Sequence, residues 1–424
     1  MLIEKVKTLK TISSSLLSIS LETRNNALIA IEENLLKNIP FILEENKKDL
    51  DDAKDISNSL YKRLILTQDK IKEIVDGIKS VRSLKDPLGN IQMERELDKG
   101  LVLTRFSVPI GVIGVIFESR PDALVQISSL FVKSGNCGIL KGGKEALHTN
   151  RALFSIIKDS LNSVDITLGK SLELAESRED IKELLKLDDY IDLMIPRGGN
   201  SLVQYIKENT KIPVMGHTDG ICHLFMDKDG DIEMGLKLTR DSKCQYPAVC
   251  NAIETLLVDK HIAKEFLPKV KTVLEKEGVE LRGCSKTLEV ININSATEED
   301  WDTEYNDYIL SIKVVENLDE AMQHINSHGS GHTDCIVTKN MDNWNRFLMN
   351  VDSASVYLNA STRFADGNRY GFGAEVGIST NKIHSRGPVG LEGLTIYKYK
   401  LVGNGDIVAD YAEGKKKFTH KDIL

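Results

Sequence analysis

The 424-residue sequence lacks the marks of several protein classes. Its six cysteines include no CxxC pair and no dense disulfide frame, which favours a reducing, cytoplasmic location. No charge-free apolar run approaches the roughly 20 residues that span a bilayer, so we expect a soluble protein without a membrane segment. The start carries Glu4, two early lysines and no small-residue cleavage signature, which argues against a secretory signal.

A basic surface stripe is also missing. Lysine and arginine number 55 against 63 acidic residues, for a net charge of -8, so we expect no nucleic-acid partner. The three lysines at 415–417 are better explained as a solvated tail. A hydrophobic share of 41% is ordinary for a globular protein, and the length suggests two or three domains.

The first 85 or so residues read as helices. Thr67 with Asp69 makes a plausible helix start, and the apolar residues that follow are spaced as one helical face. This pattern predicts an amphipathic helix packed on a larger domain. The residues of that face are Ile71, Ile74, Val75, Ile78 and Val81.

From residue 108 onward, short apolar runs alternate with helical stretches, which indicates parallel sheets covered on both faces. The segment 88–107 reads as a hairpin, or equally as an ordinary sheet edge. Helices are expected at 122–133, 144–161 and 201–209. Strands are expected at 108–117, 137–140, 190–195 and 212–215, and in a second series at 223–226, 254–258, 309–315, 333–338 and 355–359.

Two glycine-containing turns point to ligand binding. Residues 138–145, GILKGGKE, nearly spell a P-loop, but Glu145 replaces the Ser or Thr that holds magnesium and would repel phosphates. A strand ending at Lys141 and a helix starting near Lys144 remain, at the sheet edge where α/β proteins bind ligands. The turn Arg197-Gly-Gly-Asn-Ser201 suits an anion at a helix N-terminus, although an ordinary strand-to-helix turn fits too.

Histidines 324, 328 and 332 are spaced by four and could form a metal-binding helical face. Gly329 and Gly331 interrupt that helix, and neither an acidic residue nor a cysteine completes the set. We therefore expect no metal site.

Cys250 stands between a polar, lysine-bearing turn and an apolar strand. That position suits a nucleophile, because a reactive thiol needs partial exposure and nearby donors or positive charge to lower its pKa. A buried structural cysteine is the alternative of similar weight on local grounds.

The wider string around Cys250 resembles the nucleophile segment of the gamma-glutamyl phosphate reductases, a family of the aldehyde dehydrogenase superfamily. The resemblance rests on Lys243, Gln245, Pro247, Cys250, Asn251, Glu254 and Thr255, and on similar strings at 108–121 (VPIGVIGVIFESRP), 138–145, 195–200 (IPRGGN), 356–364 (VYLNASTRF) and 384–392 (HSRGPVGLE). The superfamily lacks GxGxxG, and no strand here is followed by that motif.

The resemblance implies an α/β, aldehyde dehydrogenase-like fold with two doubly wound parallel-sheet domains plus an oligomerisation hairpin and tail. Residues 1–87 and 108–228 would form the cofactor-binding domain, and 229–385 the catalytic domain with the nucleophile. The hairpin 88–107 and the tail 386–424 would pair between subunits of a homo-oligomer, a dimer or tetramer.

The implied reaction is NADPH-dependent reduction of L-glutamyl 5-phosphate to L-glutamate 5-semialdehyde through a Cys250 thioester, in proline synthesis. A glutamate 5-kinase is the candidate protein partner. Arg120 would bind the acyl phosphate, with a surface arginine beside a helix as the alternative. The amino-acid end would contact Asn359, Ser361, Thr362 and Arg363, and NADPH would contact Lys141, Lys144, Glu145, Arg197, Gly198, Gly199, Ser201 and Glu304.

Two residues of this chain differ from those of the oxidative relatives or of many reductases, and both differences matter for the chemistry. His217 stands where oxidative aldehyde dehydrogenases have a glutamate that activates water, so a thioester should escape hydrolysis. Tyr246 stands where many bacterial reductases have arginine. Both features resemble the reductase half of the pyrroline-5-carboxylate synthases, whose kinase half this chain has no room for.

Two other functions remain open at this point. An oxidative or CoA-acylating aldehyde dehydrogenase would use water or CoA and show no dependence on phosphate. A non-catalytic binding protein could keep the fold, although an intact Cys250 counts against it.

Overall fold

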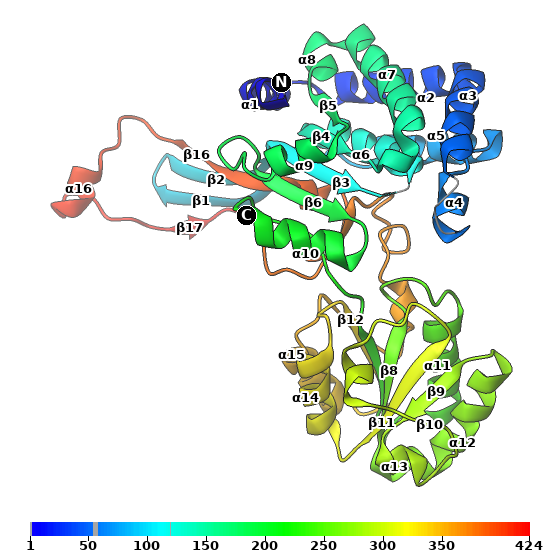
Figure 1. The fold of residues 1–424 in the computed structure, drawn as a ribbon. Helices are drawn as coiled ribbons and strands as arrows, with labels where there is room; N and C mark the ends of the chain where they lie inside the picture. The colour runs from blue at the N-terminus through cyan, green and yellow to red at the C-terminus, as the bar shows by residue number, and fades with distance from the viewer. Residues whose placement is uncertain (1, 54–57, 119) are drawn as a thin grey trace.

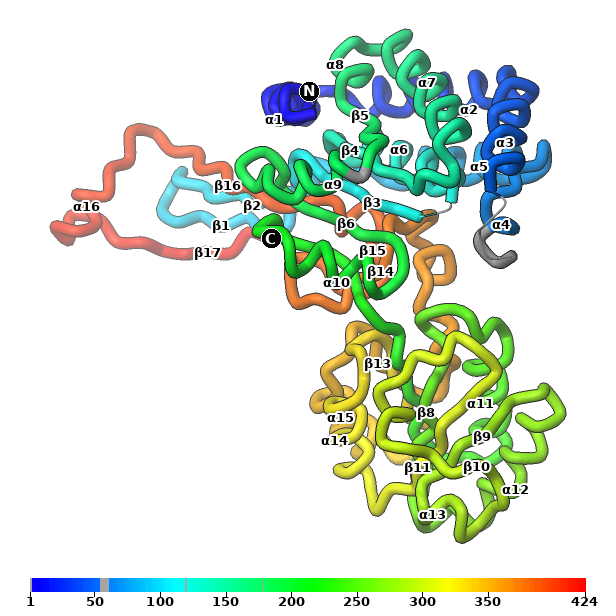
Figure 2. The backbone as a smooth tube through the Cα atoms, in the orientation of Figure 1, coloured from blue at the N-terminus to red at the C-terminus, as the bar shows by residue number. Residues whose placement is uncertain are grey.

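The computed structural model describes residues 2–53, 58–118 and 120–424. It consists of two α/β bodies and an extended arm (Figure 1). The chain passes from the first body to the second after α10 (Asn200–Asn209) and returns after β13 (Ser355–Leu358), as Figure 2 shows. Across the described part of the chain, each helix is too short or too polar to span a membrane.

Five helices form the start of the chain. Over the described residues, they confirm the prediction that the first 85 or so residues are helical. Residues 1 and 54–57 of that region lie outside them. Thr67 caps a helix by accepting a hydrogen bond from the Lys70 backbone N–H, and that helix buries Ile71, Val75, Ile78 and Val81. The helices are α1 (Leu2–Leu16), α2 (Leu21–Lys37), α3 (Ile39–Asp52), α4 (Asn58–Leu64) and α5 (Gln68–Ser83).

The first body contains a four-stranded parallel sheet in the order β5-β4-β3-β6. Every residue of its two central strands is buried, as expected where helices cover both faces. Its elements are β3 (Val112–Phe117), α6 (Pro121–Ser134), β4 (Cys137–Lys141), a 3₁₀ turn (Lys144–Ala146), α7 (Leu147–Val164), α8 (Ile166–Gly169), β5 (Leu172–Ala175), α9 (Arg178–Leu184), β6 (Leu193–Arg197) and α10.

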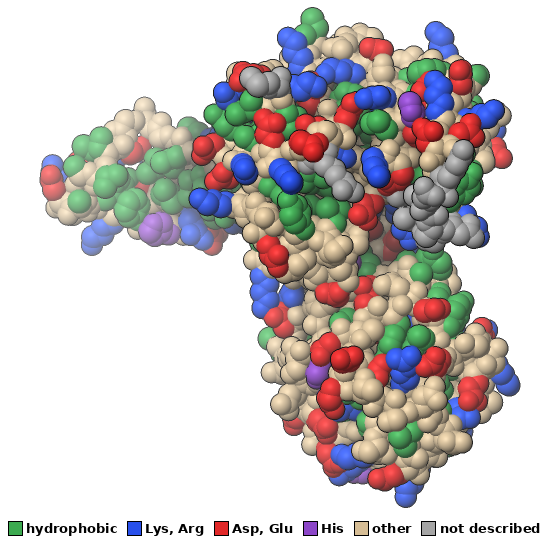
Figure 3. All heavy atoms as spheres, in the orientation of Figure 1, with side chains coloured by type: hydrophobic (Ala, Val, Ile, Leu, Met, Phe, Trp, Pro, Cys, Tyr) green, Lys and Arg blue, Asp and Glu red, His purple; other side chains and the backbone are tan. Residues whose placement is uncertain are grey.

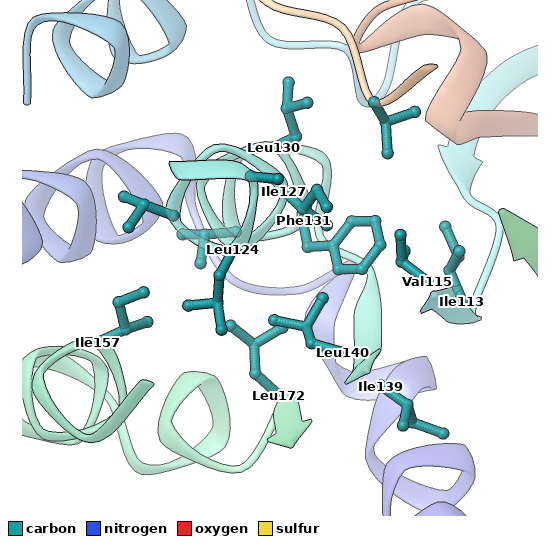
Figure 4. Packing of buried hydrophobic residues seen from close by; sticks show 14 of the residues in the cluster. Ile113, Val115, Leu124, Ile127, Leu130, Phe131, Ile139, Leu140, Ile157 and Leu172 are labelled. Carbon is teal, nitrogen blue, oxygen red and sulfur yellow. The ribbon is translucent and has the colours of Figure 1, made fainter. Parts of the chain in front are cut away.

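Helix α6 packs directly on this sheet. Figure 4 shows Phe131 of α6 beside Val115 of β3 and Leu140 of β4. A Cβ atom on Gly138 would lie 2.3 Å from the Phe131 ring. Glycine at 138 is therefore what allows the helix to approach the strand so closely.

The second body is built on a seven-stranded parallel sheet in the order β10-β9-β11-β8-β7-β12-β13. The expected second series of strands is present, while β9 and β10 were not predicted. The elements are β7 (Cys222–Met226), α11 (Ile232–Cys244), β8 (Ile253–Asp259), α12 (Lys260–Lys276), β9 (Glu280–Gly283), α13 (Ser285–Leu288), β10 (Asn294–Ser295), a 3₁₀ turn (Glu298–Asp302), β11 (Ile309–Val315), α14 (Leu318–His328), β12 (Thr333–Val337), α15 (Met341–Asn350) and β13.

The arm is an antiparallel sheet in the order β16-β2-β1-β17. Its central hairpin, β1 (Ile91–Asp98) and β2 (Leu101–Pro109), confirms the predicted hairpin. The outer strands β16 (Thr395–Val402) and β17 (Lys421–Asp422) come from the C-terminal tail, with α16 (Val408–Ala412) between them. Hydrophobic side chains gather on its surface (Figure 3).

Residues near the C-terminus also complete the core of the first body. Strands β14 (Gly377–Ser379) and β15 (Gly387–Val389) pair with each other, and a 3₁₀ turn (Glu392–Leu394) follows. Five buried side chains from this return segment join the same hydrophobic core as helices α1, α2 and α6. They are Ala374, Val376, Val389, Leu391 and Leu394.

Three predicted strands need correction. The run 108–117 is two strands, because Gly111 at φ 131° turns the chain from the arm into the first sheet. Among the described residues, the expected strand at 212–215 is absent, and one bridge between Val214 and Met194 is its only ladder contact. Pro213 has no N–H to donate to a ladder. The strand expected at 190–195 begins at Leu193, since residue 191 still closes a turn onto Leu187.

Candidate active site

Cys250 lies on the loop between α11 and β8, partly exposed, and against the backbone of Gly220. A Cβ atom on Gly220 would lie 2.4 Å from the Cys250 Cα, so this close approach requires glycine. The next residue, Asn251, donates to the Ala365 carbonyl at 2.9 Å and accepts from the Thr362 hydroxyl at 2.7 Å. The nucleophile loop is therefore tied to the segment that follows β13.

The thiol of Cys250 is not activated as the sequence suggested. Burial, then the carboxylates of Glu304 and Glu375, raise its pKa to about 12, and Arg363 opposes them. Lys243, whose charge was expected to lower this pKa, points into the interior and pairs with Glu254 at 2.6 Å. The thiol is thus protonated at neutral pH in this structure.

Two imidazoles flank the thiol. One ring nitrogen each of His217 and His332 and the Cys250 Sγ all lie within 4.8 Å of one another. Burial lowers the pKa of His217, and burial followed by the neighbouring His217 lowers the pKa of His332 to about 3, so both rings are neutral. The expected helix break is present, because α14 ends at His328 and leaves His332 outside it.

Three of the four predicted residues after β13 contact the nucleophile loop or the end of α11. Arg363 donates from Nε to Gln245 at 3.0 Å and acts electrostatically on Cys250. Thr362 holds the loop as described above, and the Ser361 hydroxyl lies 3.1 Å from that of Ser242. The Asn359 side chain instead bonds the Thr338 backbone through both its oxygen and its nitrogen.

Glu304 connects the nucleophile loop with the glycine turn of the first body. Burial raises its pKa, while hydrogen bonds from the Gly220 backbone and the side chains of Asn200 and Asn306 oppose that shift. Asn200 begins α10, in the first body. Glu304 therefore lies where both bodies meet, within electrostatic range of Cys250.

The turn before α10 leaves its backbone accessible. Gly198, Gly199 and Ser201 are exposed, and a Cβ atom on Gly199 would meet no atom within 4 Å. The Gly199 N–H donates to the Glu118 carboxylate at 2.9 Å. Arg197 precedes the turn at the end of β6 and lies 3.5 Å from the Gln126 side chain.

The predicted lysines sit at the carboxyl end of β4, but in different environments. Lys141 is buried and donates to the Gly142 carbonyl, whereas Lys144 is exposed. Glu145 folds its carboxylate over Gly143, where a Cβ atom would lie 1.9 Å from its Oε1. Lys144 is the one of the two lysines whose ammonium group faces solvent.

Arg120 is exposed at the start of α6 and donates to Asp122 at 3.2 Å. It acts electrostatically on Arg197 and on Glu375. Glu375, which also influences Cys250, accepts a hydrogen bond from the Gly367 N–H at 2.8 Å. Sequence reasoning missed Glu375, because neither a motif nor a local pattern marks it.

Comparisons with known proteins agree on one family. Residues 298–383 match the model of the aldehyde dehydrogenase family. The gamma-glutamyl phosphate reductase of Ruminiclostridium cellulolyticum is 53% identical over 411 residues, covering 96% of this chain and 95% of the relative. That of Brachyspira hyodysenteriae is 51% identical and covers 100% and 99%. The crystal structure of the Thermotoga maritima reductase superposes with a TM-score of 0.93 at 42% identity, covering 96% and 99%.

Proposed function

Because the chain belongs to the gamma-glutamyl phosphate reductases, oxidoreductases of the aldehyde dehydrogenase family, we propose that it reduces L-glutamyl 5-phosphate with NADPH. The products would be L-glutamate 5-semialdehyde and phosphate, and the intermediate a thioester on Cys250. The observation that carries this proposal is the position of Cys250, held between Gly220, Glu304, Arg363 and two neutral imidazoles.

The first step forms a bond between the Cys250 sulfur and the acyl carbon. The bond from that carbon to the phosphate oxygen breaks, and phosphate leaves. The thiol proton can pass to the neutral imidazole of His217 as the bond forms, whereas His332, with a pKa of about 3, is too weak a base for this role. The Cys250 backbone N–H faces its own sulfur. It is available to donate to the oxyanion that forms on the acyl oxygen during the attack.

The charged groups suit an acyl phosphate. Arg120 presents its guanidinium to solvent and can bind the phosphoryl oxygens in a planar fork. Arg363 acts electrostatically on Cys250 and would support the acyl end. Ser361, Thr362 and Asn359 shape the amino-acid end, of which Asn359 acts through the backbone that it holds.

The residues at the first sheet suit a nicotinamide dinucleotide. When bound, NADPH supplies the two electrons that reduce the thioester. The turn at Gly199, where a Cβ atom would meet no atom within 4 Å, has Arg197, Gly198 and Ser201 beside it and suits a diphosphate at a helix N-terminus, which would take the Gly199 N–H that Glu118 now holds. Lys144 fits the ribose 2'-phosphate, Lys141 and Glu145 shape that pocket, and Glu304 lies toward the nicotinamide end.

We also assign the arm to assembly with a second copy of the chain. Strand β16 is exposed along nearly its whole length, including Tyr397, Tyr399 and Leu401, which is costly for an isolated sheet. Residues 88–107 and 386–424 are thus the oligomerisation unit, beside a cofactor-binding domain (1–87 and 108–228) and a catalytic domain (229–385). A glutamate 5-kinase is the partner whose product this enzyme would consume.

The decisive experiment runs the reaction backwards, with glutamate 5-semialdehyde, phosphate and NADP, and follows the absorbance of NADPH. We expect turnover that requires phosphate and falls by about four to six orders of magnitude in Cys250→Ala. Turnover with water or CoA in place of phosphate would favour an oxidative or CoA-acylating dehydrogenase instead. No turnover under any of these conditions would favour a non-catalytic protein.

A further inference from the structure

We propose that His217, Cys250 and His332 form a binding site for one zinc ion, which blocks the nucleophile reversibly. The three residues come from separate segments: the loop after α10, the loop before β8 and the residue before β12. One imidazole nitrogen from each histidine and the Cys250 Sγ all lie within 4.8 Å of one another. Two nitrogens and one sulfur are a ligand set that zinc prefers, with a fourth position left for water.

The spacing is close to that of a metal site. Zinc bonds of about 2.0 Å to nitrogen and about 2.3 Å to sulfur place tetrahedral ligand atoms about 3.3–3.7 Å apart. The ligand atoms therefore need to close by about 1 Å. The two imidazole rings meet edge to face with centroids 5.4 Å apart, and the partly exposed His217 and Cys250 side chains are the ones that would move toward the buried His332.

A second observation comes from His332, whose side chain is 1% exposed. Its Nδ1 lies 2.8 Å from the Thr333 hydroxyl, which fixes the ring, and its Nε2 has no hydrogen-bond partner among the described residues. The His217 ring has a backbone hydrogen bond with Asp219. Buried polar atoms are nearly always paired, so the unpartnered Nε2 of His332 indicates a ligand.

The charges around the cluster favour a cation. Glu304 and Glu375 act on Cys250 with negative potential, and Arg363 opposes them. Metal binding displaces the thiol proton, which passes to solvent. Thiolate and imidazole ligands select zinc over magnesium or calcium, which take oxygen ligands.

The consequence for activity rests on the proposed function of Cys250, whereas metal binding itself does not. A sulfur lone pair committed to zinc is unable to attack the acyl carbon. Zinc should therefore inhibit, and a chelator should restore activity. The metal also protects the thiol from oxidation and alkylation while it is bound.

Cobalt(II) titration tests the site directly, because a cobalt–thiolate bond gives a charge-transfer band that zinc then displaces. We expect one cobalt per chain, loss of the band in Cys250→Ala, and affinity lowered at least about 100-fold in His217→Ala and in His332→Gln. His328→Ala and Cys244→Ala are matched controls with another histidine and another partly exposed thiol, and both should retain the band. Urea unfolding of each variant checks that it remains folded, and His217→Ala covers the case in which the buried His332→Gln fails to fold.

The outcomes separate this site from the proposed reaction. A cobalt band that depends on both histidines in a protein without reductase activity would support the metal site and refute the proposed function. Reductase activity with zinc affinity unchanged in His217→Ala would overturn the site and leave the function standing. Zinc inhibition and a cobalt band that persist at full affinity in both His217→Ala and His332→Gln would show that the metal binds the thiol alone, and would also overturn the site.

Discussion

The Lys243 ammonium lies 2.6 Å from the Glu254 carboxylate, and neither side chain is exposed to solvent. The two residues flank the nucleophile loop, Lys243 in the last turn of α11 and Glu254 in β8, four residues after Cys250. Burial raises the pKa of Glu254 to about 7, an effect that Lys243 opposes. The Asn306 N–H adds a hydrogen bond to the same carboxylate at 3.3 Å.

Removing one partner of this pair should be costly. Glu254→Gln leaves the Lys243 charge buried and unpaired, so we expect the free energy of unfolding to fall by about 3–5 kcal/mol in urea titrations. The double variant Lys243→Met with Glu254→Gln removes that charge and should recover part of the loss. A double variant less stable than Glu254→Gln alone would show that the lysine is not held by this pair.

The raised pKa of Cys250 predicts an unusual pH profile for alkylation. In the free enzyme, the rate with iodoacetamide should rise about tenfold per pH unit between about pH 7 and pH 10, because the thiolate fraction keeps growing below a pKa of about 12. Mass spectrometry of the peptide containing Cys250 separates it from Cys244. A plateau near neutral pH would contradict the structure and restore the expectation of a low-pKa thiol.

Cofactor preference should depend on Lys144. Lys144→Ala should raise the KM for NADPH by about 10- to 100-fold, the worth of a charge-assisted hydrogen bond, with little change for NADH. Lys141→Ala is the matched variant, in which a buried lysine is removed, so loss of stability should accompany any change in KM. Equal changes for both cofactors in Lys144→Ala would place its ammonium away from the 2'-phosphate.

His217 should control what becomes of the thioester. With semialdehyde and NADP but no phosphate, the unmodified enzyme should form little glutamate, because no carboxylate activates water at this position. His217→Glu should raise the ratio of glutamate to glutamyl phosphate formed when phosphate is present. This ratio is independent of the overall rate, so an unchanged ratio in an active variant would rule out the position as a water-activating site.

Most helices and strands were predictable from the sequence, because each leaves a regular spacing of apolar residues. The strand expected at 309–315 matches β11, and the helix expected at 201–209 differs from α10 by one residue. The strand expected at 212–215 failed because its apolar composition hid the missing donor of Pro213. Strand β9 has four residues of mixed burial and β10 has two exposed residues, so they carry little pattern.

Site residues were predictable where they lie in one continuous sequence motif, as Cys250 and Arg363 do. The site was not predictable where the position of a side chain depends on the tertiary structure. Sequence adjacency placed Lys243 near Cys250, but the helix turns its side chain toward Glu254. His332 and Glu375 reach the thiol from segments about 80 and 125 residues downstream, a proximity that depends on the order of strands in the sheet.

The C-terminal return segment sets the order in which the protein can mature during synthesis. The first body needs Val376, Val389 and Leu394 to fill its core, and the arm needs Asp422, which pairs with Arg95 across 327 residues. The body that begins the chain is therefore the last to be completed, whereas the sheet between β7 and β13 has all its strands earlier. Until residues 374–394 have left the ribosome, the N-terminal helices expose an unfinished core, and we expect nascent chains stopped before that segment to bind chaperones.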